Sequence, residues 1–373
     1  MKTSGKSVSR VLALFCCLIT GYCQAGIYGS LEKAGSVPAG FAAMRLSLGE
    51  LRGTEANDPA IPVEPGSLRA EYQALRSRLE AVAAPTSRDL MELGVANMRL
   101  GQAEKAMIIL EKLAGGESEN GDSSIAAERF QLLLNLAACY AMQSSRQQDL
   151  AFMLRAVTTQ RRGLDAWPES PAKAPGGWDF SIWRSLLAAE EAQLRLWKLR
   201  LREGASVATS LRLEAVMGTS GQVPGMMAAY RAGPAPSSFW RNAPEDGLNV
   251  TRQLLLWTPS DNRLFWLYGE WLNARGEVAN ARSVLEELVD ARRLRGFPEL
   301  VEHWQVLRNA AESILVTEQP IVPNPETIGG DSPERRAGAD LALPNWQTLL
   351  VGIGAGAVLA MLARMQLQKW RGK

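Results

Sequence analysis

Residues 93–110 read Leu-Gly-Val-Ala-Asn-Met-Arg-Leu-Gly-Gln-Ala-Glu-Lys-Ala-Met-Ile-Ile-Leu, and residues 268–285 read Tyr-Gly-Glu-Trp-Leu-Asn-Ala-Arg-Gly-Glu-Val-Ala-Asn-Ala-Arg-Ser-Val-Leu. The two stretches share four positions, separated in both by seven, five and four residues. These are Gly94, Gly101, Ala106 and Leu110 in the first stretch, and Gly269, Gly276, Ala281 and Leu285 in the second. Such internal similarity predicts one supersecondary unit that occurs at least twice.

The spacing of the shared residues predicts a pair of packed helices. A first helix is expected to end at Gly101, because glycine adopts the left-handed cap conformation without strain. Gly94, seven residues earlier, lets a second helix cross close to the first, with the small Ala106 facing that crossing. Leu110 follows one turn later and supplies apolar bulk to the core. Both copies are therefore predicted to be helix-turn-helix pairs.

This pattern resembles the tetratricopeptide repeat (TPR). The matching residues are Leu90, Leu93, Gly94, Gly101, Ala106 and Leu110 in the first copy, and Phe265, Tyr268, Gly269, Gly276, Ala281 and Leu285 in the late copy. A weaker third copy, residues 135–140, fits the first helix, and its second helix near residues 150–156 is slightly out of register. The resemblance implies a helical solenoid whose first helices line a concave groove.

The fold class predicted from these patterns is all-α: a TPR-like helix-turn-helix solenoid with an irregular insert, plus a single C-terminal transmembrane helix. Tryptophans at helical spacing, such as Trp183, Trp197, Trp257 and Trp271, are expected in the core. The predicted segments are a signal peptide (1–25), an extended N-terminal arm with little regular structure (26–66), a first TPR-like block (67–164), a long helix and irregular insert (165–246), a second TPR-like block (247–316), a Pro/Gly-rich linker (317–343), the transmembrane helix (344–368) and a basic tail (369–373).

The N-terminus has the pattern of a secretory signal. Lys2, Lys6 and Arg10 precede a mostly apolar run at residues 11–22, and Ala25 fits the last position before cleavage. The run is shorter than the roughly 20 residues that span a bilayer. An uncleaved anchor is the alternative, whereas the bulky Tyr22 before Cys23 argues against a lipoprotein site.

The C-terminal apolar stretch predicts a membrane-spanning helix. Residues 341–363 carry no charge, and Trp346 and Trp370 bracket the stretch, roughly 36 Å apart along a helix. The tail after it is basic and the linker before it is mainly acidic, so the positive-inside rule places the tail in the cytoplasm and the bulk of the chain outside, in the periplasm if the source is bacterial. A buried globular helix is the alternative.

Small residues within the apolar stretch permit close packing of two membrane helices. Gly352, Gly356 and Ala360 are spaced by four residues, as in helix-dimerisation stripes. A homodimer through this helix is possible on this pattern, although glycine and alanine are also common in membrane helices generally.

Composition argues against several function classes. Only Cys139 remains outside the N-terminal apolar segment, and His303 is the single histidine, so neither a disulfide nor a zinc site is expected. The formal net charge of +2 gives no support to nucleic-acid binding. No residue cluster predicts a catalytic site, a metal site or a cofactor, and the chain is expected not to be an enzyme.

The TPR resemblance assigns groove-facing positions to the first helix of each repeat. In the late copy these are Trp266, Glu270 and Asn273; in the early copy they are Met91, Val95 and Met98, with Arg88 and Arg99 nearby. A groove lined in this way suits a peptide ligand.

Three functional hypotheses follow from these features. The first is a membrane-anchored, extracytoplasmic scaffold that binds a protein or peptide through the TPR-like groove and the lipid bilayer through its C-terminal helix. The second is an accessory subunit of an envelope assembly or maturation complex. The third is a purely structural envelope component.

Overall fold

Helices are the only regular secondary structure among the residues that the computed structural model describes, namely 27–32, 37–38, 40–55, 63–120, 128–174, 178–204, 230–240 and 246–317. The all-α prediction is therefore confirmed for this part of the chain. The α-helices are α2 (Phe41–Glu55), α3 (Leu68–Glu80), α4 (Ser87–Arg99), α5 (Ala103–Asn120), α7 (Arg129–Gln147), α8 (Leu150–Asp165), α9 (Phe180–Glu203), α10 (Ser237–Trp240), α11 (Gly247–Trp257), α12 (Asn262–Ala274), α13 (Val278–Glu286) and α14 (Pro298–Thr317). Two short turns complete the set: a 3₁₀ turn, η1 (Pro171–Lys173), and a π-helical turn, η3 (Glu287–Ala291).

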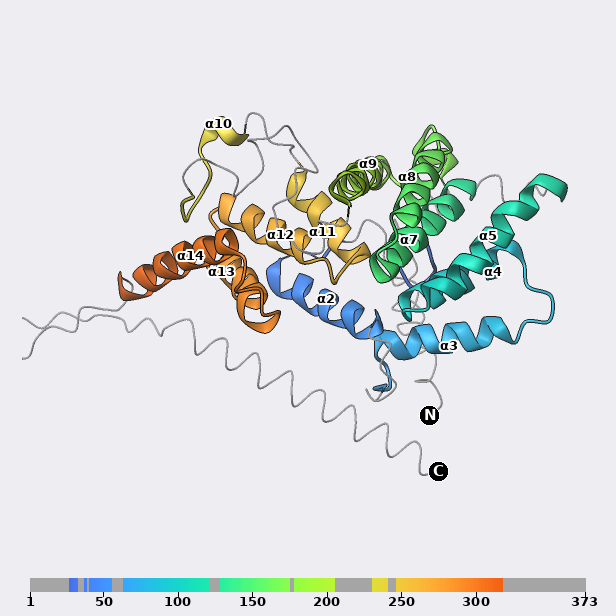
Figure 1. Cartoon of the computed structure of the whole chain (residues 1–373), viewed down its shortest axis with the longest axis horizontal. Coiled ribbons are helices and arrows are strands. Elements are labelled where there is room, and N and C mark those ends of the chain that lie inside the picture. Colours follow the sequence, from blue (N-terminus) through green and yellow to red (C-terminus); the bar gives the residue numbers. More distant parts are fainter. Residues whose placement is uncertain are drawn as a thin grey trace, which may run out of the picture. The chain divides into compact units, whose positions relative to one another are not determined.

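Each helix packs mainly against its neighbours in the sequence (Figure 1). Contacts run from α3 through α4, α5, α7 and α8 to α9, and from α11 through α12 and α13 to α14. Packing of α11 on α9 joins the two series. This order follows from the short turns between successive amphipathic helices.

The turns of the two repeat copies have the same geometry, 175 positions apart in the sequence. Gly101 and Gly276 adopt φ angles of 71° and 85°, the left-handed conformation expected for them. The Gln102 amide donates to the carbonyl of Asn97 at 2.7 Å, and the Glu277 amide donates to the carbonyl of Leu272 at 2.9 Å. These bonds satisfy the last carbonyls of α4 and α12, so both glycine caps are confirmed.

The glycine seven residues before each cap lies at the helix crossing. A methyl group placed on Gly94 would come within 2.7 Å of Leu110, and one placed on Gly269 would collide with Leu285. The expectation that these glycines allow a close approach is therefore confirmed in both copies, but the nearest side chain is the leucine and not the predicted alanine. Ala106 and Ala281 are fully buried.

The third predicted pair, α7 and α8, forms with a different cap. Gln148 ends α7 in the left-handed conformation with a φ of 55°, which a non-glycine residue tolerates at some cost. The glycine at the close crossing also lies on the second helix of the pair and not on the first, because Gly163 of α8 abuts Leu134 of α7. The helix pair exists, therefore, and its departure from the repeat pattern explains why its register is difficult to predict.

The prediction of an extended arm with little regular structure over residues 26–66 is wrong for residues 41–55. Phe41–Glu55 form α2, which buries Met44, Leu48 and Leu51 along one face. Arg52 of α2 donates to the carbonyl of Pro259 at 2.8 Å and to the carboxylate of Glu287 at 2.7 Å. Helix α2 thereby lies against both helical series, next to α11 and α3 in Figure 1.

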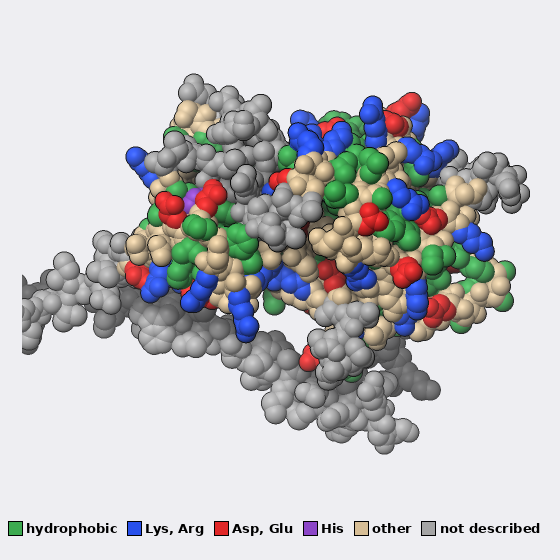
Figure 2. Space-filling view, in the orientation of Figure 1, with side chains coloured by type: hydrophobic (Ala, Val, Ile, Leu, Met, Phe, Trp, Pro, Cys, Tyr) green, Lys and Arg blue, Asp and Glu red, His purple; other side chains and the backbone are tan. Residues whose placement is uncertain are grey.

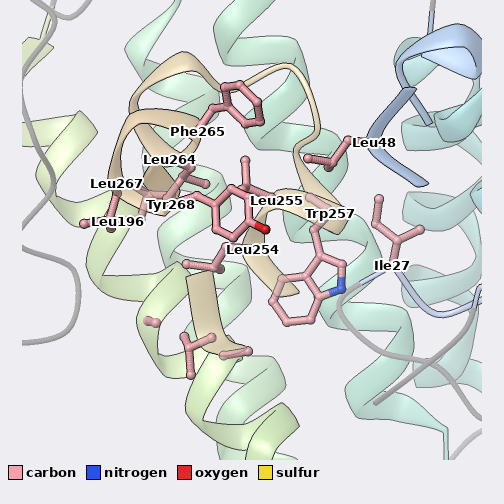
Figure 3. Close-up of a cluster of buried hydrophobic side chains, with 14 of the residues drawn as sticks. Ile27, Leu48, Leu196, Leu254, Leu255, Trp257, Leu264, Phe265, Leu267 and Tyr268 are labelled. Carbon is pink, nitrogen blue, oxygen red and sulfur yellow. The ribbon is translucent and has the colours of Figure 1, made fainter. Parts of the chain in front are cut away.

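The core draws side chains from widely separated segments. Figure 3 shows Ile27 and Leu48 meeting residues of α9, α11 and α12 in one apolar cluster. Trp197, Trp257 and Trp271 are buried as predicted, whereas Trp183 is only half-buried and donates its indole N–H to the carbonyl of Pro168. The long helix predicted within residues 165–246 is confirmed by α9, and the helical character predicted for residues 247–316 is confirmed by helices that include α11 and α14.

No helix within the described residues is long and apolar enough to cross a membrane. The predicted signal peptide (1–25), most of the linker, the transmembrane segment (344–368) and the basic tail lie outside the described residues. So do the packing residues Gly352, Gly356 and Ala360.

Candidate functional site

Seven of the eight predicted groove residues are buried. Arg88 is the exception: its side chain is 68% exposed and pairs with Glu128 at 3.0 Å. The others are Met91, Val95, Met98, Arg99, Trp266, Glu270 and Asn273. Several of them contact non-helical segments of the same chain. Residues 27–32 contact Val95 and Arg99 of α4, and residues 231–233 contact Asn273 of α12.

The contact with residues 27–32, here called the N-terminal segment, centres on one asparagine of α7. The Tyr28 amide donates to Oδ1 of Asn135 at 2.6 Å, and Nδ2 of Asn135 donates to the Tyr28 carbonyl at 3.0 Å. The side-chain amide of Asn135 thus supplies the acceptor and the donor that the main chain of a neighbouring β-strand would otherwise supply to Tyr28. This is how a helix surface can bind a non-helical peptide without a sheet edge.

The following residues of the N-terminal segment lie against α4. The Ser30 amide donates to the carboxylate of Glu92 at 2.7 Å, and the Glu32 amide donates to the Gly29 carbonyl at 3.0 Å, which closes a turn. A methyl group on Gly29 would come within 2.6 Å of Val95. Only glycine therefore fits at this position without displacing α4.

The segment ends in a buried ion pair. Arg99, whose side chain is 1% exposed, donates through Nε and Nη2 to the two carboxylate oxygens of Glu32 at 2.5 and 2.7 Å. The Tyr72 hydroxyl donates to the same carboxylate at 2.5 Å. Burial lowers the pKa of Arg99, but the attraction of Glu32 outweighs burial and the net pKa is raised. Burial and the Glu32 charge raise the pKa of Tyr72, so its hydroxyl stays protonated.

The Tyr28 side chain enters an aromatic pocket. Its ring packs edge-on against Phe130 and is stacked with Trp178, with ring centroids 5.6 and 6.3 Å away. The hydroxyl donates to Glu190 at 2.9 Å, and the side-chain amide of Gln160 donates to the same carboxylate. Burial raises the pKa of Glu190 to about 7, more than these two hydrogen bonds lower it.

The predicted groove residues of the late copy are engaged in a second network. Trp266 donates its indole N–H to Glu270 at 2.7 Å, and Nδ1 of His303 lies 2.8 Å from the same oxygen. The Tyr230 ring stacks on the His303 ring with centroids 3.6 Å apart. His303 is thus a buried residue of the core.

Asn273 of α12 binds main-chain groups of a non-helical segment, as Asn135 of α7 does. Its Nδ2 donates to the Arg231 carbonyl at 2.8 Å, and its Oδ1 accepts from the Gly233 amide at 2.9 Å. The Ala235 amide donates to the Ala274 carbonyl at 2.8 Å, which continues the contact. Two asparagines on two first helices therefore hold the main chain of two non-helical segments.

An open cavity of about 250 Å³ adjoins the N-terminal segment at Ile27. Helix α7 contributes Ala138 and Ala141, and α9 contributes Trp197. Trp257 closes the cavity from α11. The Arg200–Asp261 ion pair, 2.8 Å long, lies at its polar edge.

Sequence reasoning missed the residues that make the closest contacts. Asn135 stands out as a single polar side chain in the apolar run of residues 132–139, and this signal could have marked it. Tyr28, Glu32 and Glu92 gave no local signal, since their significance depends on segments that the fold alone brings together. Arg99 was named, and it does bind a peptide segment, although that segment belongs to the same chain.

Within the described residues, no group of three or more His, Cys, Asp or Glu side chains is placed to hold a metal ion. On the face shown in Figure 2, basic side chains lie among acidic ones.

No family model, curated protein or solved structure matches this chain.

Proposed function

We propose that this protein is a non-catalytic interaction scaffold, anchored in a membrane by its C-terminal apolar segment, whose TPR-like first helices bind a peptide region of a protein partner on the outer side. Two observations support the TPR-like part: the matched glycine caps at Gly101 and Gly276, and the matched crossings at Gly94 and Gly269. The export and anchor segments rest on their sequence patterns.

The observation that carries the proposal is the way in which α4 and α7 hold residues 27–32. Asn135 binds main-chain groups and Arg99 binds a carboxylate, while the Tyr28 ring fills a pocket. Main-chain hydrogen bonds, one charge-assisted pair and one aromatic anchor are the usual components of peptide recognition. The surface therefore has the chemistry of a peptide-binding groove.

Co-purification of the full-length, detergent-solubilised chain tests the proposal. Ala141→Phe adds bulk to the cavity wall on α7, and Gln147→Phe adds the same bulk at an exposed position of the same helix. We expect mass spectrometry to find partner proteins that are retained by the wild type and Gln147→Phe but lost from Ala141→Phe. If all three chains retain the same proteins, or if none of them retains any protein, the result would favour a purely structural component.

Topology is tested separately. A reporter fused after Lys373 is expected to report the cytoplasm, because the residues that follow the apolar stretch are basic. An external signal from this reporter would contradict the anchor orientation.

A further inference from the structure

We propose that residues 27–32 are an internal ligand of the groove, and that the external ligand which replaces them is a short peptide with Tyr-Gly, an acidic residue three positions after the glycine, and a large apolar residue directly before the tyrosine. This proposal rests on the proposed function, because it names the ligand class of the same groove. It also predicts how the groove is regulated, since the ligand must compete with the chain's own segment.

The first part of this ligand description comes from the contacts of the internal segment. Asn135 binds only main-chain groups of Tyr28, so these hydrogen bonds do not select a side chain. The preference for tyrosine comes from the pocket of Phe130 and Trp178, which its ring enters. The glycine is required by Val95, against which any side chain would clash. The acidic residue is required by Arg99, which is buried and would otherwise keep only the more distant Glu55 carboxylate, 4.0 Å away.

The second part comes from the cavity beside Ile27. Ile27 forms one wall of the cavity, and about 250 Å³ remains open beyond it. Trp257, which is 3% exposed, lines the opposite side, and its indole N–H has no hydrogen-bond partner among the described residues. Figure 3 shows the indole nitrogen on the side of the ring that faces Ile27. Open volume bordered by Ile27, Trp197 and Trp257 indicates a place for a larger apolar side chain at the position of Ile27.

Tethering explains why a ligand needs this additional contact. A segment on the same chain competes at an effective concentration on the order of millimolar. A free peptide that made only the contacts of residues 27–32 would lose this competition at micromolar concentration. An aromatic residue in place of Ile27 reaches apolar surface that the internal segment leaves unused, and this difference allows exchange.

The test is fluorescence anisotropy with two labelled hexapeptides and the full chain in detergent. One has the sequence of residues 27–32, Ile-Tyr-Gly-Ser-Leu-Glu, and the other has phenylalanine in the first position. We expect the phenylalanine peptide to bind at least about tenfold more tightly. Replacing its glutamate by glutamine, or its glycine by alanine, is expected to weaken binding by a similar factor. Amide hydrogen exchange of residues 27–32 in the protein should rise as the peptide binds.

Matched protein variants locate the binding. Ala141→Phe fills the cavity, so it is expected to abolish the advantage of the phenylalanine peptide, while Gln147→Phe should preserve it. Ile27→Phe in the protein should make the internal segment the stronger competitor and weaken binding of both peptides. The comparison between the two peptides uses one and the same protein, so loss of folding does not explain it.

Several results would overturn the internal-ligand proposal. These are no binding of either peptide at about 1 mM, binding that is indifferent to the glutamate, or binding without faster exchange in residues 27–32. The scaffold proposal would survive any of them if Ala141→Phe still loses partner proteins that Gln147→Phe retains. Peptide exchange without any partner in co-purification would instead contradict the scaffold and leave the ligand assignment standing.

Discussion

The side-chain amide of Asn135 pairs with both main-chain groups of Tyr28, a residue 107 positions earlier in the sequence. Helix surfaces rarely present a matched donor and acceptor to a passing chain, because their own main-chain groups are already used. One asparagine in an apolar helix face therefore decides where the N-terminal segment docks.

Removing this side chain is the first test of its importance. Asn135→Ala removes both hydrogen bonds that its side chain makes to the main chain of Tyr28 in a buried site, which costs about 2–4 kcal/mol of unfolding free energy. We expect a lower midpoint in urea unfolding and faster amide exchange in residues 27–32. Gln147→Ala, an exposed change on the same helix, is the control and should change neither quantity. Slow exchange in the Asn135→Ala segment would show that other contacts hold it.

The buried pair of Arg99 and Glu32 gives a second prediction. Arg99→Met leaves the Glu32 carboxylate buried without its partner, at a cost of about 3–5 kcal/mol in unfolding free energy. Adding Glu32→Gln removes the unpaired charge and is expected to recover part of this loss. Arg88→Met breaks an exposed ion pair and should have little effect. A double variant less stable than the sum of its single changes would contradict this account.

Glu190 predicts a dependence of stability on pH. Its pKa is about 7 in the folded protein and near 4.5 when unfolded, so the folded state holds a proton that the unfolded state has released. The stabilisation is complete below pH 4.5 and is lost as pH rises through about 7. Glu190→Gln mimics the protonated acid. It should match the wild type near pH 4.5 and exceed its unfolding free energy at pH 8 by up to roughly 3 kcal/mol.

Urea unfolding at these two pH values measures the effect. The neighbouring Glu191→Gln is the control, because the Glu191 side chain is 53% exposed and lies beside Arg195 on the protein surface. If both variants respond equally to pH, burial of Glu190 is not the cause.

The helix crossings give a fourth prediction. Gly94→Ala and Gly269→Ala force a methyl group onto Leu110 and Leu285 respectively, which is expected to cost about 1–3 kcal/mol through overpacking. Gly115→Ala places a methyl group in open space on α5 and should stabilise the protein by up to about 1 kcal/mol. Thermal unfolding distinguishes these opposite signs. Equal stabilisation at all three glycines would mean that the crossings adjust freely.

The local architecture was predictable because its signals are short-range. Gly101 and Gly276 each end a helix through residues within one turn of themselves, and Gly94 and Leu110 meet within a single hairpin. Helix α2 also carried a usable signal, since Met44, Leu48 and Leu51 recur at helical spacing. The glycine and proline content of the surrounding residues concealed it.

The site was harder to predict because its contacts span the chain. The register of the first helices marked Val95 and Asn273 as groove-facing and placed Arg99 nearby, and these residues do contact non-helical segments. Nothing local to Tyr28 or Tyr230 indicates that these residues dock against α7 and α14. Sequence patterns can assign a face to a helix, but they cannot show which distant segment covers it.

The contacts of α2 also bear on how this chain acquires its structure. In ordinary helical arrays each unit depends on its neighbours, so folding can begin anywhere and the ends fray independently. Here Arg45 and Arg52 both pair with Glu287, and Arg45 and Glu287 are 242 positions apart. Arg45 and Arg52 of α2 find this partner only after the intervening helices have been made, and contacts between such distant residues slow folding. Once made, these bonds join α2 to the turn that follows α13, so we expect the described part of the chain to melt in one cooperative transition.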